Sequence, residues 1–440
     1  MKTIWFHMQG YRDLPDDFRD RYESIWVTPP TDELCDPETV GKYLNWNLDE
    51  LELADDLGFD GLGLNEHHQN AYGFPVSPNL IAANLARRKS DAAIVMLGNT
   101  LPLYNPPLRV AEEMALLDCL SGGRLVAGWP VGSAMDTAGC YGITPTEVRP
   151  RYYEAHDLIK QAWTKPGPFP FNGKFTKLRY VNLWPKPIQK PHPPIWCAGG
   201  GSVETWKFAA ENDYTYSYLS FLGHKAAQNM MNRYWDTVAA SGRDDNPYRA
   251  GFAQLVVVSE TDAQAEKEYL PHIRNFFDKS LYIAGHHAVV PGYMTKHSLE
   301  FNLKRSGGAT PFGAVSGKDM TWQEQVEKQG IVIGGSPKTV ADRLTEAVKN
   351  LRVGHLMVIL QIQSMEPELT AKNTRLFAEE VLPRIRGIWD EQGYEDRWWP
   401  QGATRNAQAR SPQVNGSDAA RGATRNESEA PHMTAKGAHS

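Results

Sequence analysis

Short apolar runs alternate with longer amphipathic segments along most of the chain. Eight runs are rich in aliphatic and aromatic side chains and have the length of buried strands: residues 1–7, 61–64, 93–98, 125–127, 195–198, 215–219, 254–258 and 355–362. Segments with apolar residues at helical spacing lie between or after them: residues 40–57, 80–88, 110–117, 152–163, 203–212, 225–241, 262–277, a segment after 337 and a last one that ends near 389.

This alternation predicts the fold class. Strands that alternate with helices favour a parallel sheet with right-handed crossovers, and eight such units can close into a barrel. We therefore expect an α/β protein with a single parallel (β/α)8 TIM-type barrel over residues 1–395. An open doubly wound sheet is the alternative.

Two insertions and a tail interrupt the pattern. Residues 165–190, after the fourth strand, are centred on Phe-Asn-Gly-Lys-Phe and are predicted to form a hairpin. Residues 280–327, after the seventh strand, are predicted to form a lid or a substrate-facing insertion, because so long a loop in a compact domain is usually functional or disordered. Residues 400–440 have few large apolar side chains and repeat Gly-Ala-Thr-Arg-Asn, which predicts a disordered tail.

Composition excludes several classes of partner. The 440 residues are 41% hydrophobic and 22% charged, with a formal net charge of −6. There is neither a membrane-length apolar stretch nor a basic block, so membrane and nucleic acid are not expected partners. The N-terminus lacks the pattern of a secretory signal, which favours a cytoplasmic protein. The four cysteines are far apart with no C-x-x-C pair, so we expect buried free thiols and no metal site.

The first candidate for catalysis follows the second strand. Reactive groups of a parallel barrel lie at the carboxyl ends of its strands, where this sequence has Glu66, His67 and His68. A histidine can hold or donate a proton near neutral pH. A purely structural histidine pair is the alternative. A metal site is disfavoured, because neighbouring residues on a strand point to opposite faces.

Three further segments are candidates for binding a flat, anionic ligand. They are Asn99 and Thr100 after the third strand, Gly128 and Gly132 after the fourth, and Gly199, Gly200, Gly201 and Ser202 after the fifth. In the last segment the glycines free backbone N–H groups to face an anion, and Ser202 can cap the following helix. Ordinary turn chemistry is the alternative in each case.

An ordered series of motifs resembles the bacterial luciferase-like monooxygenases over about residues 1–395. The series is Gly58-Phe59-Asp60, Glu66-His67-His68, Asn105-Pro106-Pro107, Ala111-Glu112-Glu113, Leu117-Asp118-Cys119-Leu120-Ser121-Gly122-Gly123-Arg124, Arg151-Tyr152, Pro193-Pro194-Ile195-Trp196 with the glycines after it, and Ile333-Gly334-Gly335-Ser336-Pro337. Each motif is weak alone, and their order makes the resemblance specific.

The resemblance implies an FMN-dependent monooxygenase. Reduced FMN, supplied as a diffusible cosubstrate by a separate NAD(P)H:flavin reductase, would react with O2 to give a C4a-peroxyflavin that oxygenates a small organic substrate. Relatives of this kind commonly form homodimers. The alternatives are a reduced deazaflavin that transfers hydride on the same fold, a non-catalytic flavin-binding barrel, and an unrelated barrel enzyme.

The resemblance also assigns the site residues. His67 matches the family's active-site histidine, with Glu66 and His68 beside it. The residues expected to bind the cofactor are Asn99, Thr100, Gly128, Gly132, Tyr152, Gly199, Gly200, Gly201 and Ser202. This chain departs from many relatives at Val131, where they carry an arginine that reaches the phosphate. Either the glycine turn suffices, helped by another basic group, or the flavin is held weakly.

Overall fold

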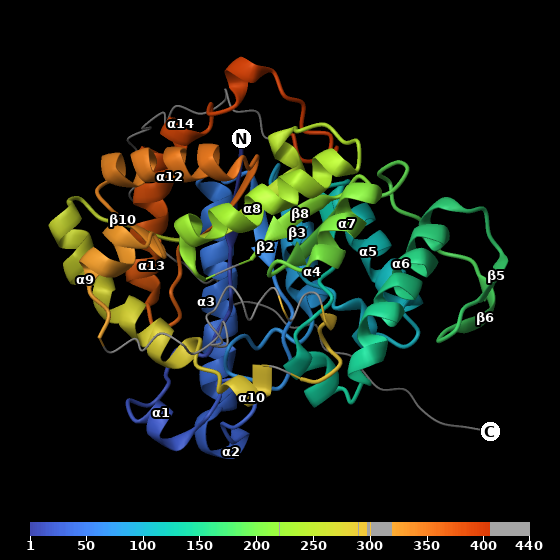
Figure 1. Ribbon diagram of the computed structural model, residues 1–440, viewed down its shortest axis with the longest axis horizontal. Coiled ribbons are helices and arrows are strands. Elements are labelled where there is room, and N and C mark those ends of the chain that lie inside the picture. Colours follow the sequence, from blue (N-terminus) through green and yellow to red (C-terminus); the bar gives the residue numbers. More distant parts are fainter. Residues whose placement is uncertain (220, 289, 297–299, 301–318, 405–440) are drawn as a thin grey trace, which may run out of the picture. The chain divides into compact units, whose positions relative to one another are not determined.

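Within the residues that the structure describes, eight parallel strands close into a barrel surrounded by helices (Figure 1). This computed structural model describes residues 1–219, 221–288, 290–296, 300 and 319–404. The barrel strands are β1 (Lys2–Phe6), β2 (Gly61–Leu64), β3 (Ala93–Met96), β4 (Leu125–Gly128), β7 (Ile195–Gly199), β8 (Thr215–Tyr218), β9 (Ala250–Val258) and β11 (His355–Ile359). Because β1 pairs with both β2 and β11, and β8 with both β7 and β9, the barrel is confirmed and an open sheet is excluded.

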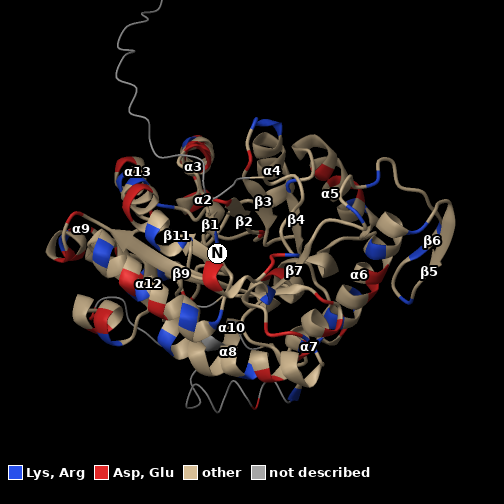
Figure 2. Cartoon of the chain, turned by 90° about the horizontal axis from the view of Figure 1, so that it is seen from above, with Lys and Arg blue, Asp and Glu red and all other residues tan. Residues whose placement is uncertain are grey.

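Helices form the crossovers and lie outside the strands (Figure 2). They are α3 (Pro37–Asp56), α4 (Pro78–Arg87), α5 (Leu108–Ser121), α6 (Val148–Thr164), α7 (Val203–Glu211), α8 (Gly223–Ala240), α9 (Asp262–Asn275), α12 (Pro337–Leu351) and α13 (Pro367–Leu376), with the short α1 (Phe18–Arg21), α2 (Thr31–Leu34), α10 (Gly285–Ala288) and α14 (Leu382–Ile385). Local signals set their ends. Asp36 caps α3 by accepting from the Thr39 N–H, and α5 ends at Gly122, whose φ is 70°.

One strand, β10 (Val332–Gly335), is missing from the sequence-based prediction. It pairs with the later half of β9, where Val332 lies opposite Leu255. This strand forms because β9 begins at Ala250, earlier than predicted, and extends past β8, which it pairs only as far as Phe252. The backbone N–H and C=O groups of β9 beyond its pairing with β8 need partners, and β10 supplies them.

Alternate residues of the barrel strands face opposite sides. On β1, Trp5 packs among the helices and donates its indole N–H to Thr374 Oγ1 (3.3 Å), whereas Ile4 and Phe6 face the interior. Near the amino-terminal end of the barrel, Trp399 stacks on His355 with ring centroids 5.7 Å apart. The barrel is therefore a packed core, and the free space lies at the carboxyl ends of the strands.

The expected hairpin is confirmed. Strands β5 (Phe169–Asn172) and β6 (Lys177–Val181) pair antiparallel beyond α6. The Glu154 carboxylate on α6 accepts hydrogen bonds from backbone N–H groups of the hairpin turn at 2.6 to 3.0 Å, which fixes the hairpin to α6.

The predicted lid and tail fall partly outside the described residues. Of the 280–327 insertion, residues 280–288, 290–296, 300 and 319–327 are described, and they include Tyr293 beside the barrel opening. Of the predicted tail, residues 400–404 are described and are packed. Gly402 N–H donates to the Gly123 carbonyl at 2.9 Å, and Gln401 N–H donates to Gln189 at 3.1 Å. The rest of the tail, 405–440, lies outside the described residues.

Candidate active site

A cavity of about 400 Å³ opens at the carboxyl ends of the barrel strands. This size falls within the range of about 300–1,000 Å³ that is typical of small-molecule sites. Most of its wall is apolar, with Phe6, Trp26, Tyr72, Phe277, Leu281 and Ile359 among the lining residues. Its polar lining includes His67 and the turn of residues 199–202.

His67 is held by a carboxylate that the sequence did not single out. Its Nδ1 lies 3.0 Å from Asp136 Oδ2, and its ring packs edge-on against Trp26 and Tyr72, with centroids 5.3 and 4.9 Å away. The His67 side chain is 19% exposed, and its Nε2 makes no hydrogen bond to another described residue. One ring nitrogen is therefore fixed, and the other is available to a ligand.

Asp136 is itself held in place. Burial alone would raise the pKa of its carboxyl group, but hydrogen bonds from His67, the Ser133 hydroxyl (2.8 Å) and the His68 backbone N–H (3.1 Å) hold that pKa below its usual value. The carboxylate therefore stays charged near neutral pH and holds the His67 ring in place. Asp136 lies in a π-helical turn, Met135–Cys140, and no sequence motif marks it.

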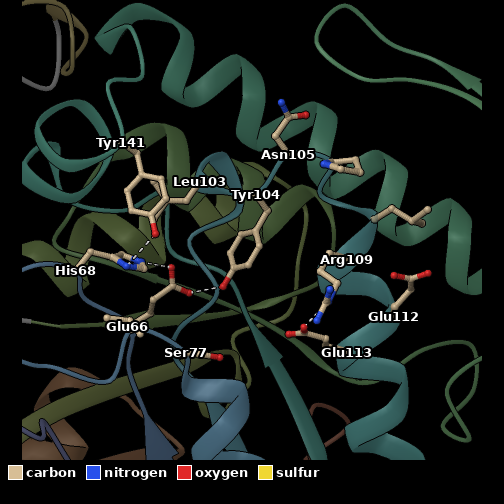
Figure 3. Close-up of a pocket in the computed structure, with 13 residues that line it drawn as sticks. Glu66, His68, Ser77, Leu103, Tyr104, Asn105, Arg109, Glu112, Glu113 and Tyr141 are labelled. Carbon is tan, nitrogen blue, oxygen red and sulfur yellow. Dashed lines mark hydrogen bonds and ion pairs between the residues drawn. The ribbon is translucent and has the colours of Figure 1, made fainter.

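His68 points away from the cavity into a second pocket of about 530 Å³ (Figure 3). Its Nε2 lies 2.8 Å from Glu66, and its Nδ1 lies 3.2 Å from the Tyr141 hydroxyl. The other Glu66 oxygen accepts from Tyr104 at 2.8 Å and from the Thr100 N–H at 3.3 Å. Glu66 lines both the cavity and the second pocket. His68 does not line the cavity, and both of its ring nitrogens are hydrogen-bonded within the protein.

The glycine turn faces the cavity and carries a basic partner that the sequence analysis left unnamed. Arg149, in the first turn of α6, donates to Ser202 Oγ at 3.0 Å and to Thr205 Oγ1 at 3.4 Å. Residues 199–202 and Arg149 all line the cavity. Arg149 belongs to α6 and not to the 128–132 segment, where Val131 stands, so that segment gave no signal for it.

Two residues of the turn are constrained in different ways. Gly201 has a φ of 109°, and a Cβ there would lie 1.8 Å from the Met230 methyl group, so only glycine fits. A Cβ on Gly200 would instead make an ordinary contact, 3.9 Å from the Leu219 carbonyl oxygen. Ser202 occupies the N-cap position of α7, but its hydroxyl makes no capping bond and donates to Glu204 at 2.7 Å.

The remaining predicted residues divide into two groups. Thr100 and Gly132 line the cavity, and Gly132 has a φ of 97°. The Gly132 carbonyl accepts from the hydroxyl of Tyr293, which ties the insertion to the barrel loops, and burial raises the pKa of Tyr293 to about 12.

Asn99, Gly128 and Tyr152 lie outside the cavity lining. Asn99 donates to Tyr104 at 2.8 Å, and Tyr152 donates to the Trp129 carbonyl at 3.1 Å. A Cβ on Gly128 would lie 1.6 Å from the Met96 carbonyl oxygen. All three pack the barrel wall.

In the described part of the chain, no helix is long and apolar enough to cross a membrane.

A closed β/α barrel with a cavity at the carboxyl ends of its strands is an enzyme scaffold. The chain belongs to the luciferase-like monooxygenase family, whose sequence model matches residues 26–354. It is 24% identical over 379 residues to the FMNH2-dependent dimethylsulfone monooxygenase of Pseudomonas putida. This match covers 80% of this chain and 92% of that relative.

Two solved structures share the fold. One is the oxygenating constituent of 3,6-diketocamphane monooxygenase from Pseudomonas putida in complex with FMN, with a TM-score of 0.63, 17% identity, and coverage of 88% of this chain and 99% of that one. The other is an F420-dependent secondary alcohol dehydrogenase, with a TM-score of 0.58, 16% identity and the same coverage. The same fold therefore occurs in a protein solved with FMN and in one named for F420.

Proposed function

We propose that this protein is an FMN-dependent monooxygenase that uses reduced flavin and O2 to oxygenate a small organic substrate. One observation carries the proposal. The His67–Asp136 pair and the Arg149–Ser202 turn line the same cavity. A proton-handling group and an anion site in one apolar space are what a phosphorylated redox cofactor requires.

The residues present fit FMN. At the turn, the Arg149 guanidinium, the Ser202 hydroxyl and the backbone of Gly200 line the cavity and suit a phosphate. Elsewhere in the cavity, the buried Trp26 Nε1 and Asn65 Oδ1 have no hydrogen-bond partner in the described structure. A donor and an acceptor that are buried without partners suit the polar edge of a flavin ring.

The chain's own residues would manage protons and water. Reduced FMN would supply the electrons that activate O2. Asp136 holds His67 Nδ1, so a protonated His67 can donate from Nε2 to a developing anion, and a neutral one can accept a proton there. Trp26, Phe277 and Leu281 line the cavity with apolar surface that excludes water.

We further propose that a separate reductase supplies the reduced flavin, and that the enzyme works in the cytoplasm as a homodimer. The FMNH2 dependence named for the Pseudomonas putida relative supports the first point. The four cysteines are free, which fits a reducing compartment. The expectation that all of them are buried was wrong, because only Cys197 is buried, whereas Cys35 and Cys119 are exposed. Exposed Leu80 on α4 and Leu116 on the adjacent α5 offer apolar surface to a second copy, which light scattering would detect.

The test is to mix the protein and reduced FMN anaerobically with oxygenated buffer and to follow the flavin absorbance. We expect reoxidation to be slower than for free flavin and to pass through more than one phase. Reoxidation at the rate of free flavin would overturn the proposal. Reduced deazaflavin with an alcohol or ketone would then be the next combination to assay.

A further inference from the structure

The loop before Trp26 is paired with the insertion that follows α9. Ser24 and Ile283 form an antiparallel bridge. The Ala284 N–H donates to the Glu23 carbonyl at 2.8 Å, and the Ile25 N–H donates to the Tyr282 carbonyl at 2.9 Å. These backbone contacts bring Glu23 next to the short helix α10, although the two are far apart in the sequence.

Three potential ligand atoms converge at this contact. Glu23 Oε2 lies 3.3 Å from His286 Nε2 and 3.6 Å from His287 Nε2. The two imidazole rings lie with their centroids 4.0 Å apart. One atom from each of the three residues falls within 4.8 Å of the others. In a tetrahedral zinc site with bonds of about 2.0–2.1 Å, the ligand atoms lie about 3.3 Å apart.

From this convergence we propose that Glu23, His286 and His287 bind a divalent cation of the zinc class, with a fourth position left for water. Imidazole nitrogen and carboxylate oxygen are both ordinary zinc ligands. The site lies apart from the His67 cavity and does not depend on the proposed flavin chemistry.

An ordinary ion pair explains the geometry less well. A protonated Nε2 on His287 would hydrogen-bond to the carboxylate, yet it stays 3.6 Å away, is buried and has no hydrogen-bond partner in the described structure. A buried polar atom without a partner is costly. A cation placed between the three atoms would satisfy His287 and Glu23 together.

The cation would join two walls of the cavity. Trp26 and Leu281 both line the cavity, and each lies a few residues along the chain from a proposed ligand. A metal bridge between Glu23 and α10 would therefore fix the insertion against the loop before Trp26. We expect the bound metal to stabilise the fold.

The test uses the full chain without an affinity tag, after metal has been removed with a chelator. Zn²⁺ is titrated against a chromophoric chelator, and Co²⁺ binding is followed by its visible absorption. We expect one equivalent of either ion per chain, with the intense absorption of tetrahedral cobalt. Zn²⁺ should also raise the thermal unfolding temperature.

Glu23→Gln and His287→Ala should each weaken Zn²⁺ binding at least tenfold and abolish the Zn²⁺-dependent rise in unfolding temperature. Glu23 is 65% exposed, so its variant should fold like the wild type. His272→Ala is the matched control, because this half-buried histidine contacts Ser364 Oγ at 2.9 Å and belongs to no such cluster. The proposal fails if the wild type binds no stoichiometric metal, or if Glu23→Gln and His287→Ala bind it as tightly as the control.

Discussion

Arg149 should determine how much more tightly the protein binds FMN than riboflavin. These two flavins differ only in the phosphate group. Arg149→Met keeps most of the aliphatic stem and removes the guanidinium that bonds to Ser202 and Thr205. The substitution therefore tests the anion site while leaving the apolar part of the cavity in place.

The size of the effect follows from the charge and the exposure of the guanidinium. A hydrogen bond to a charged group contributes about 1.5–3 kcal/mol, which corresponds to roughly 10- to 150-fold in affinity. Arg149 is only partly buried, so water screens part of this interaction. We expect reduced FMN to bind roughly 10- to 30-fold more weakly, and riboflavin affinity to change by less than about twofold.

The assay is an anaerobic titration of wild type, Arg149→Met and Arg149→Lys with reduced FMN and reduced riboflavin. Arg149→Lys keeps the charge but loses the planar fork, so it should bind FMN with intermediate affinity. Circular dichroism and thermal unfolding establish that each variant is folded.

Two results would refute the reasoning. If Arg149→Met bound FMN as tightly as the wild type, the phosphate would lie elsewhere. If FMN and riboflavin weakened equally, Arg149 would act by shaping the cavity and not by meeting the phosphate.

Three other predictions concern charged and titratable groups, two of them in the cavity and one on the surface. Glu204→Gln should tighten FMN binding severalfold and leave the affinity for riboflavin unchanged, because the Glu204 carboxylate accepts a hydrogen bond from the Ser202 hydroxyl and would repel a phosphate bound there. An FMN affinity equal to that of the wild type would contradict this. His67→Ala and Asp136→Asn should release more hydrogen peroxide per reduced flavin with little change in flavin affinity, and unchanged peroxide yield would remove both from the mechanism. Hydrogen bonding to Arg397 lowers the pKa of Asp244 to about 2. The Asp244 carboxylate therefore stabilises the folded state above about pH 4, and this stabilisation is lost as the pH falls toward 2. Asp244→Asn should flatten that part of the acid unfolding curve.

Much of the fold could be predicted from the sequence. Apolar runs with the length of strands, separated by helical periodicity, indicate a parallel barrel, because continuous apolar runs reflect strands buried on both faces and helical periodicity reflects helices buried on one. The same reasoning identifies the strand ends as the place for chemistry. His67, Thr100, Gly132 and the turn of residues 199–202 were found in this way, and all of them line the cavity. The strand β10 was missed, because its pairing depends on how far β9 extends beyond its neighbour.

Only the tertiary structure decided which side chains meet. Asp136 lies 69 residues from His67, and Arg149 lies 53 residues from Ser202, and neither pair follows a sequence spacing. His68 was predicted beside His67 but faces the second pocket. The physical reason is that strand order fixes where each loop begins, whereas the direction of its side chains depends on packing against other loops. The sequence of this protein determined the barrel and the location of its site, and the packing of the loops determined the partners within it.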